Sequence, residues 1–157
     1  MKLRFLCANH RSQLEGNVTK AIQFWQTGFD TGQFYRDHML WPDALPHLGC
    51  AFETAEILLS KKMIEHEVAC EWFSQSSLLL ASTFANFQHR AEAAEVIWMT
   101  INRLERELAN NGSESKWVIG YLSDQYLQLN NLLSAKAQFN QAPKLPQSKP
   151  QPLVLLH

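Results

Sequence analysis

The sequence predicts an all-α fold of about five antiparallel helices, and three observations lead to this prediction. Apolar residues recur at intervals of three and four through most of the chain up to residue 139, as expected for helices that bury one face. Strand-like alternation of polar and apolar residues is confined to residues 2–5. Four of the six prolines follow residue 140. Helix should therefore exceed about 60% of the residues, well above the roughly 30–35% of average globular domains.

The first predicted helix follows Asn17, a residue type that caps helix N-termini with its side-chain oxygen. Its apolar stripe includes Gly28 and Gly32, which lie four residues apart and hence on one face. Because glycine has no side chain, we expect a neighbouring helix backbone to come close there. Residues 1–14 give no clear signal for helix, strand or coil.

A second helix is expected to begin near Asp43 as N-cap and to end around residues 61–62. This start places Pro46 in the first turn, where a missing N–H costs nothing. A start at Pro42 would place Pro46 deeper and cost a hydrogen bond. A third helix is predicted over about residues 65–87, with an apolar face broad enough for a central position.

The fourth helix is the clearest, with a narrow apolar stripe on which Trp98 and Leu104 should be buried. Gly112 follows two asparagines and should end this helix. Ser113 or Ser115 is then expected to cap a fifth helix that runs to about residue 139.

Composition divides the chain into a single helical domain, residues 1–140, and a Pro-rich extended tail, residues 141–157. The tail contains Lys144 and Lys149 and ends in four adjacent apolar residues at 153–156. Exposed together these four would favour aggregation. We therefore expect them to pack against the chain's own helices, a second copy or a partner.

Charge and hydropathy exclude several classes of protein. The net charge is -1 with no basic stripe, which argues against a nucleic-acid partner. Residues 43–95 carry an excess of acidic groups, which would attract a basic partner. No apolar run approaches the roughly 18 residues of a membrane span. Three cysteines and no recognisable signal peptide favour a cytoplasmic location.

Motifs for phosphate binding, nucleophilic catalysis and metal-dependent catalysis are missing, so we predict a protein that is not an enzyme and uses no cofactor. Two His–Cys pairs have helical spacing, His47 with Cys50 and His66 with Cys70. The second helix and the third should form a hairpin that places these pairs at different heights. We therefore predict no metal site.

The residues around Ala44 resemble a tetratricopeptide repeat (TPR), a helical hairpin in which small and aromatic residues fill the contact between two helices. The matching positions are Gly32, Tyr35 and Trp41 before Ala44, and Leu48 and Ala51 after it. A weaker copy is centred on Ala93, but the two copies lie 49 residues apart, against about 34 in the family. A TPR-like array and an unrelated antiparallel bundle are therefore both compatible with the sequence.

The resemblance implies that a partner peptide binds the concave surface formed by the first helix of each hairpin. The residues carried over to that surface are Gln26, Phe29, Gln33, Arg36, Gln75, Leu78, Ser82 and Asn86. The Lys and Asn with which some family members grip a terminal carboxylate are replaced by Phe29 and Gln33. The implied function is a non-catalytic adaptor, regulator or chaperone that binds another protein or peptide.

Two other functions fit the same sequence. A small helical-bundle enzyme or ligand-binding protein would have a closed pocket beneath the tryptophans, lined by a buried histidine or carboxylate. A self-associating structural subunit would pair the uncovered ends of two hairpins as a homodimer.

Overall fold

The computed structural model describes residues 3–140, of which 85% are helical, with no strand among them. This confirms the all-α prediction. Six α-helices and one short 3₁₀ helix follow each other along the chain: α1 (Ala8–Glu15), α2 (Val18–Asp37), α3 (Trp41–Ser60), α4 (His66–Asn86), α5 (Arg90–Asn111), η1 (Gly112–Ser115) and α6 (Val118–Asn140). The helix α1 begins within residues 1–14, which carry no clear secondary-structure signal, and ends one residue beyond them.

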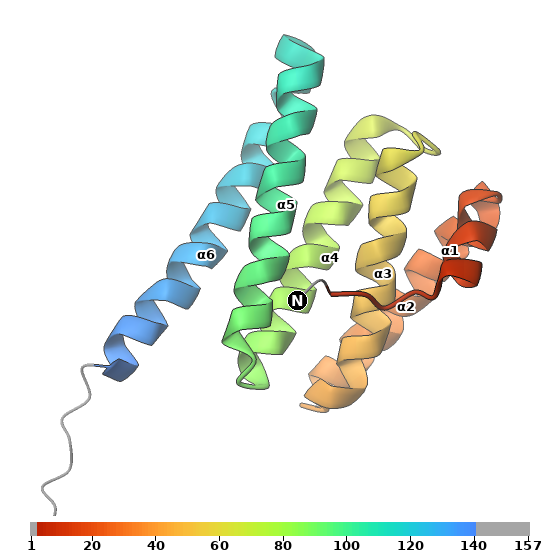
Figure 1. Cartoon of the computed structure of the whole chain (residues 1–157). Helices are drawn as coiled ribbons and strands as arrows, with labels where there is room; N and C mark the ends of the chain where they lie inside the picture. The colour runs from red at the N-terminus through yellow and green to blue at the C-terminus, as the bar shows by residue number, and fades with distance from the viewer. Residues whose placement is uncertain (1–2, 141–157) are drawn as a thin grey trace, which may run out of the picture.

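The five long helices form two layers (Figure 1). Each packs against the next in the chain, and α4 also contacts α6. The helices α2, α4 and α6 therefore lie in one layer, and α3 and α5 lie in the other. Most of the core side chains come from α3, α4 and α5. In this arrangement α4 is the central helix, as its broad apolar face predicts.

The closest helix contact is between α2 and α3, at the two predicted glycines. A Cβ atom placed on Gly28 would lie 3.0 Å from the carbonyl oxygen of His47, and one on Gly32 would lie 2.4 Å from the side chain of Leu48. Both glycines are buried. The expectation of a close backbone approach is confirmed at Gly28, whereas at Gly32 the side chain of Leu48 fills the space.

The predicted start of the second helix is wrong. The helix α3 begins at Trp41, so that Pro46 lies inside it and the hydrogen bond to the Pro42 carbonyl is missing. Both prolines are exposed, so water can reach this carbonyl. A residue of α2 stabilises this earlier start, because the Arg36 guanidinium lies 5.6 Å from the centre of the ring of Trp41, the first residue of α3.

Two predictions for the second half of the domain are also corrected. Leu104 is fully buried, but Trp98 is 47% exposed, because the buried arc of α5 is centred near Ala93 and Leu104 and Trp98 lies outside this arc, about 130° from its centre at 100° per residue. Ser115 does not cap α6. It belongs to the 3₁₀ helix that separates the end of α5 from Val118.

Gly112 ends α5 as predicted, with φ at 57°. This value lies in the left-handed region, which glycine adopts without steric cost.

Small polar residues of α4 are buried against three neighbouring helices. Ser76 accepts a hydrogen bond of 2.8 Å from the Trp25 indole of α2, and the two rings of Trp25 and Trp72 stack 4.0 Å apart. Ser77 accepts a hydrogen bond of 2.7 Å from Thr100 of α5. No buried side-chain nitrogen or oxygen among the described residues lacks a partner.

Gln125 makes the corresponding contacts from α6 and is fully buried. Its amide nitrogen donates to the Ser74 hydroxyl at 3.0 Å and to the Ser74 carbonyl at 3.1 Å. Its amide oxygen accepts a hydrogen bond of 3.1 Å from Ser77. These bonds fix the position of α6 along α4.

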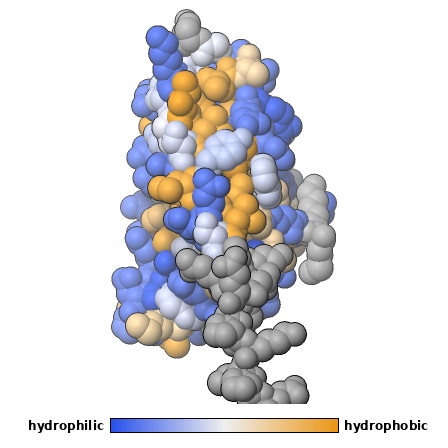
Figure 2. All heavy atoms as spheres, turned by 90° about the vertical axis from the view of Figure 1, so that its left-hand side faces the viewer, coloured by the Kyte–Doolittle hydropathy of each residue, from blue (hydrophilic) through white to orange (hydrophobic). Residues whose placement is uncertain are grey.

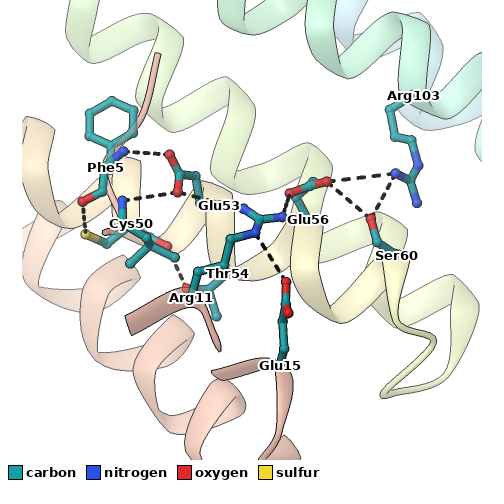
Figure 3. Close-up of polar contacts among 10 residues, drawn as sticks. Phe5, Arg11, Glu15, Cys50, Glu53, Thr54, Glu56, Ser60 and Arg103 are labelled. Carbon is teal, nitrogen blue, oxygen red and sulfur yellow. Dashed lines mark hydrogen bonds and ion pairs between the residues drawn. The ribbon is translucent and has the colours of Figure 1, made fainter. Parts of the chain in front are cut away.

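The segment before α1 is bound to α3 through Glu53 (Figure 3). The Glu53 carboxylate accepts hydrogen bonds from the backbone N–H groups of Phe5, at 2.6 Å, and Leu6, at 3.1 Å. The Phe5 ring occupies the space above Gly49, where a Cβ atom would lie 2.1 Å from it. A neighbouring cluster joins α1, α3 and α5, because Glu56 pairs with both Arg11 and Arg103.

Within residues 3–140, none of the helices combines the length and the apolar character needed to cross a membrane. The predicted C-terminal tail, residues 141–157, lies outside the described residues.

The α2–α3 contact gives a first prediction. Gly32→Leu should lower the free energy of unfolding by about 2–3 kcal/mol, because the side chain would overlap Leu48 in a filled core. Gly120→Ala is the matched control in α6, where a Cβ atom meets nothing within 4 Å. It should raise stability by up to about 1 kcal/mol through helix propensity. Denaturant unfolding measures both changes. Equal effects of the two substitutions would contradict the close contact.

Candidate binding groove

An open groove of about 470 Å³ lies on the layer formed by α2, α4 and α6. Its floor is the outward face of α4, where Gln75, Leu78 and Ser82 follow each other at helical spacing. Phe29 of α2 forms one wall. The other wall belongs to α6, with the residues Asp124, Leu127, Gln128 and Asn131.

The groove brings together four of the eight residues that the TPR resemblance assigns to a binding surface: Phe29, Gln75, Leu78 and Ser82. The other four do not line it. Gln26 and Gln33 are exposed on α2, and Asn86 is exposed at the last position of α4.

Arg36 is held within the fold. Its guanidinium is half-buried and donates to the carbonyl of Leu79 at 3.2 Å and to the hydroxyl of Thr83. It also covers the Trp41 ring. Arg36 therefore links α2, α4 and α3, and its replacement would alter the fold together with any binding.

Sequence reasoning missed the wall contributed by α6. Residues 3–140 contain five long helices, and two hairpins use four of them. The fifth helix then occupies the place of the first helix in a third hairpin, in the same layer as α2 and α4. An odd number of predicted helices therefore indicates that the last helix lies beside α4. This makes the four α6 residues of the groove candidates for binding a partner.

The groove offers hydrogen-bonding groups and apolar side chains side by side. The amides of Gln75, Gln128 and Asn131 each donate and accept, as the backbone of an extended peptide requires. Leu127 is 62% exposed and faces the groove beside them. Such a surface can pair with a peptide backbone and also receive its apolar side chains.

Negative charge gathers at one end of this layer. Partial burial raises the pKa of the Tyr121 phenol, and so do the carboxylates of Glu71, Glu67 and Asp124 around it. Asp124 itself lines the groove, and no lysine or arginine does. The electrostatic potential of this end therefore favours a cationic side chain.

A second cavity, of about 510 Å³, lies beneath Trp117 and contains a histidine and a carboxylate. His66 Nε2 lies 2.8 Å from Glu107 and 3.8 Å from the Cys70 sulfur. Because both contacts use the same ring nitrogen, a His66 that donates to Glu107 is not free to deprotonate Cys70. Burial raises the pKa of the Cys70 thiol to about 12, which is the opposite of an activated nucleophile.

Glu107 ties α4 to α5 in this cavity. Burial alone would raise the pKa of its carboxyl group, but the hydrogen bonds and charges of His66 and Arg103 lower it. Arg103 Nε lies 2.8 Å from the second carboxylate oxygen. The cluster is therefore an ion-pair network between helices.

The predicted His–Cys pairs do not assemble into one site. His47 stacks on Tyr35 and the Cys50 thiol faces the Phe5 carbonyl, whereas His66 is bonded to Glu107. Among the described residues, no three histidine, cysteine or acidic side chains are grouped so as to hold a metal ion.

Comparisons of the chain with protein-family models, with curated proteins and with solved structures found no significant match.

The Glu107 network gives a prediction for pH. Its lowered pKa stabilises the fold at pH values above the ordinary value of 4.5, and this contribution is lost as the pH falls below it. Glu107→Gln should cost about 1.5–3 kcal/mol at neutral pH, the usual range for hydrogen bonds to charged groups. The difference from the natural chain should shrink in acid. Glu95→Gln, in the same helix, is the control and should change little. A pH-independent effect of Glu107→Gln would contradict the network.

Proposed function

We propose that this protein is a non-catalytic interaction module that binds an extended segment of a partner protein in the groove over α4. The observation that carries the proposal is that Gln75, Leu78 and Ser82 form the floor of an open groove between α2 and α6. A TPR-like function implies these positions from the sequence alone. The role of an adaptor, regulator or chaperone belongs to the same proposal.

The two-layer arrangement supports this function. In a TPR-like array the first helices of successive hairpins line one surface, which corresponds to α2, α4 and α6 here. The three helices are held at fixed positions by buried hydrogen bonds of Trp25 and Gln125 to α4. A rigid surface of this kind loses little conformational entropy when it binds a ligand.

The chemistry of the groove specifies the segment that it would bind. Amide side chains along the floor and the α6 wall pair with an extended backbone, and Phe29 and Leu127 receive an apolar side chain. Asp124 adds the preference for a lysine or arginine. We therefore expect a basic segment with at least one large apolar residue.

A library of random peptides on beads tests this function without a known partner. The natural protein should enrich peptides that combine a basic and a large apolar residue. Gln75→Arg with Ser82→Arg should abolish the enrichment, because two long cationic side chains would fill the groove and repel a basic peptide. Asp124→Asn should keep apolar selection and reduce the preference for basic residues.

Ala109→Arg is the matched control, because it adds a cation to an exposed position of α5 in the opposite layer. It should leave the enrichment unchanged. Circular dichroism checks that every variant keeps its helix content. Enrichment that survives the double arginine variant, or that is lost equally in the control, would contradict the proposal.

A further inference from the structure

A second surface, separate from the groove, carries apolar side chains that no described residue covers. It consists of Trp98 of α5 and of Ile119, Tyr126 and Leu133 of α6, and we call it the α5–α6 stripe. Their exposed fractions are 47%, 53%, 39% and 54%. Figure 2 looks onto the α6 side of the molecule and shows hydrophobic residues gathered on the upper part of this side between hydrophilic margins.

Helix geometry places the four side chains in one line. The α6 members are spaced by seven residues, which brings each to within about 20° of the next around the helix. Tyr126 donates a hydrogen bond of 2.7 Å to Glu105, seven residues after Trp98. Because α5 and α6 are antiparallel, a step of seven residues forward from Tyr126 in α6 matches a step of seven residues backward from Glu105 in α5. These two steps place Leu133 beside Trp98. The stripe thus follows the edge where the two helices meet.

This edge is the place where a sixth long helix would pack if the array continued. The described chain ends instead at Asn140, seven residues beyond Leu133. We propose that the chain's own tail, residues 141–157, runs back along the α5–α6 stripe and covers it. This inference does not depend on the proposed function, because the stripe and the groove lie on different sides of α6.

The length of the tail fits the stripe. From the end of α6, Leu133, Tyr126 and Ile119 lie about 10, 21 and 31 Å back along the helix, at ~1.5 Å per residue. If residues 141–143 make the turn, an extended chain at ~3.1 Å per residue brings Pro146, Pro150 and Leu153 to about 9, 22 and 31 Å. The prolines would then meet the aromatic half of the stripe, and residues 153–156 would reach Ile119.

The chemistry of the two surfaces is complementary. Proline-rich extended segments bind surfaces lined by aromatic rings because they lose little entropy on docking, and Trp98 and Tyr126 are such rings. Residues 153–156 supply four apolar side chains for the far end. Lys144 and Lys149 pass the carboxylates of Glu95 and Glu105, which border the stripe on α5. A covalently attached tail also has a high effective concentration, of the order of millimolar.

Hydroxyl-radical footprinting of the full chain, read residue by residue by mass spectrometry, tests this docking. The comparison variant replaces Leu153, Val154, Leu155 and Leu156 by serine. Oxidation of Trp98, Ile119 and Tyr126 should rise in this variant, by about tenfold if the tail is docked nine-tenths of the time. Leu127, on the groove side of the same helix, should not change. Gln147→Ser with Gln151→Ser is the control tail and should leave the stripe protected.

Limited trypsin digestion after Lys144 gives an independent readout with a matched pair of variants. Leu133 and Leu127 are both exposed leucines of α6, but only Leu133 lies on the stripe. Leu133→Asp should speed this cleavage several-fold, and Leu127→Asp should not. Circular dichroism confirms that both keep their helix content.

Three results would overturn the inference. The first is equal oxidation of the stripe in the natural chain and in the variant with serine at residues 153–156. The second is protection of Leu127 by the natural tail, which would place the tail in the groove. The third is protection that rises with protein concentration together with a doubled mass in sedimentation, which would assign the stripe to a second copy of the chain.

Discussion

The structure depends on the burial of small polar side chains in its central helix. Ser74, Ser76 and Ser77 of α4 are almost completely buried, and burying an unpaired hydroxyl group costs free energy. Each of them is therefore satisfied by a neighbour, namely Trp25 of α2, Thr100 of α5 or Gln125 of α6. Apolar contacts alone would permit helices to slide, whereas these bonds form at one register only.

The groove is a consequence of this register. Trp25 of α2 and Gln125 of α6 bind α4 on either side, and the face of α4 with Gln75 and Leu78 stays open between these two helices. The same hydrogen bonds that stabilise the core thus set the width of the candidate binding surface. The network of Glu107, Arg103 and His66 plays a comparable part between α4 and α5, away from the groove.

Features that depend on local sequence were predictable, and features that depend on tertiary packing were not. Asn17 caps α2 and Gly112 ends α5 as their residue types indicate. The helix α1 gave no signal because its cap is the Cys7 thiol and only Leu14 of it is buried. The exposure of Trp98 depends on how far α6 covers α5, which no spacing within α5 reveals.

The candidate site divides in the same way. Phe29, Gln75, Leu78 and Ser82 are positions that the TPR resemblance implies, but the α6 wall requires knowing that Gln125 is buried against α4. A double-mutant cycle of Gln125→Leu and Ser77→Ala tests this account most directly, with the free energy of unfolding as the measurement. We predict a coupling energy of about 1–3 kcal/mol, as for partners in one hydrogen-bond network. Additive effects of the two substitutions would contradict the role of the buried polar contacts in positioning α6.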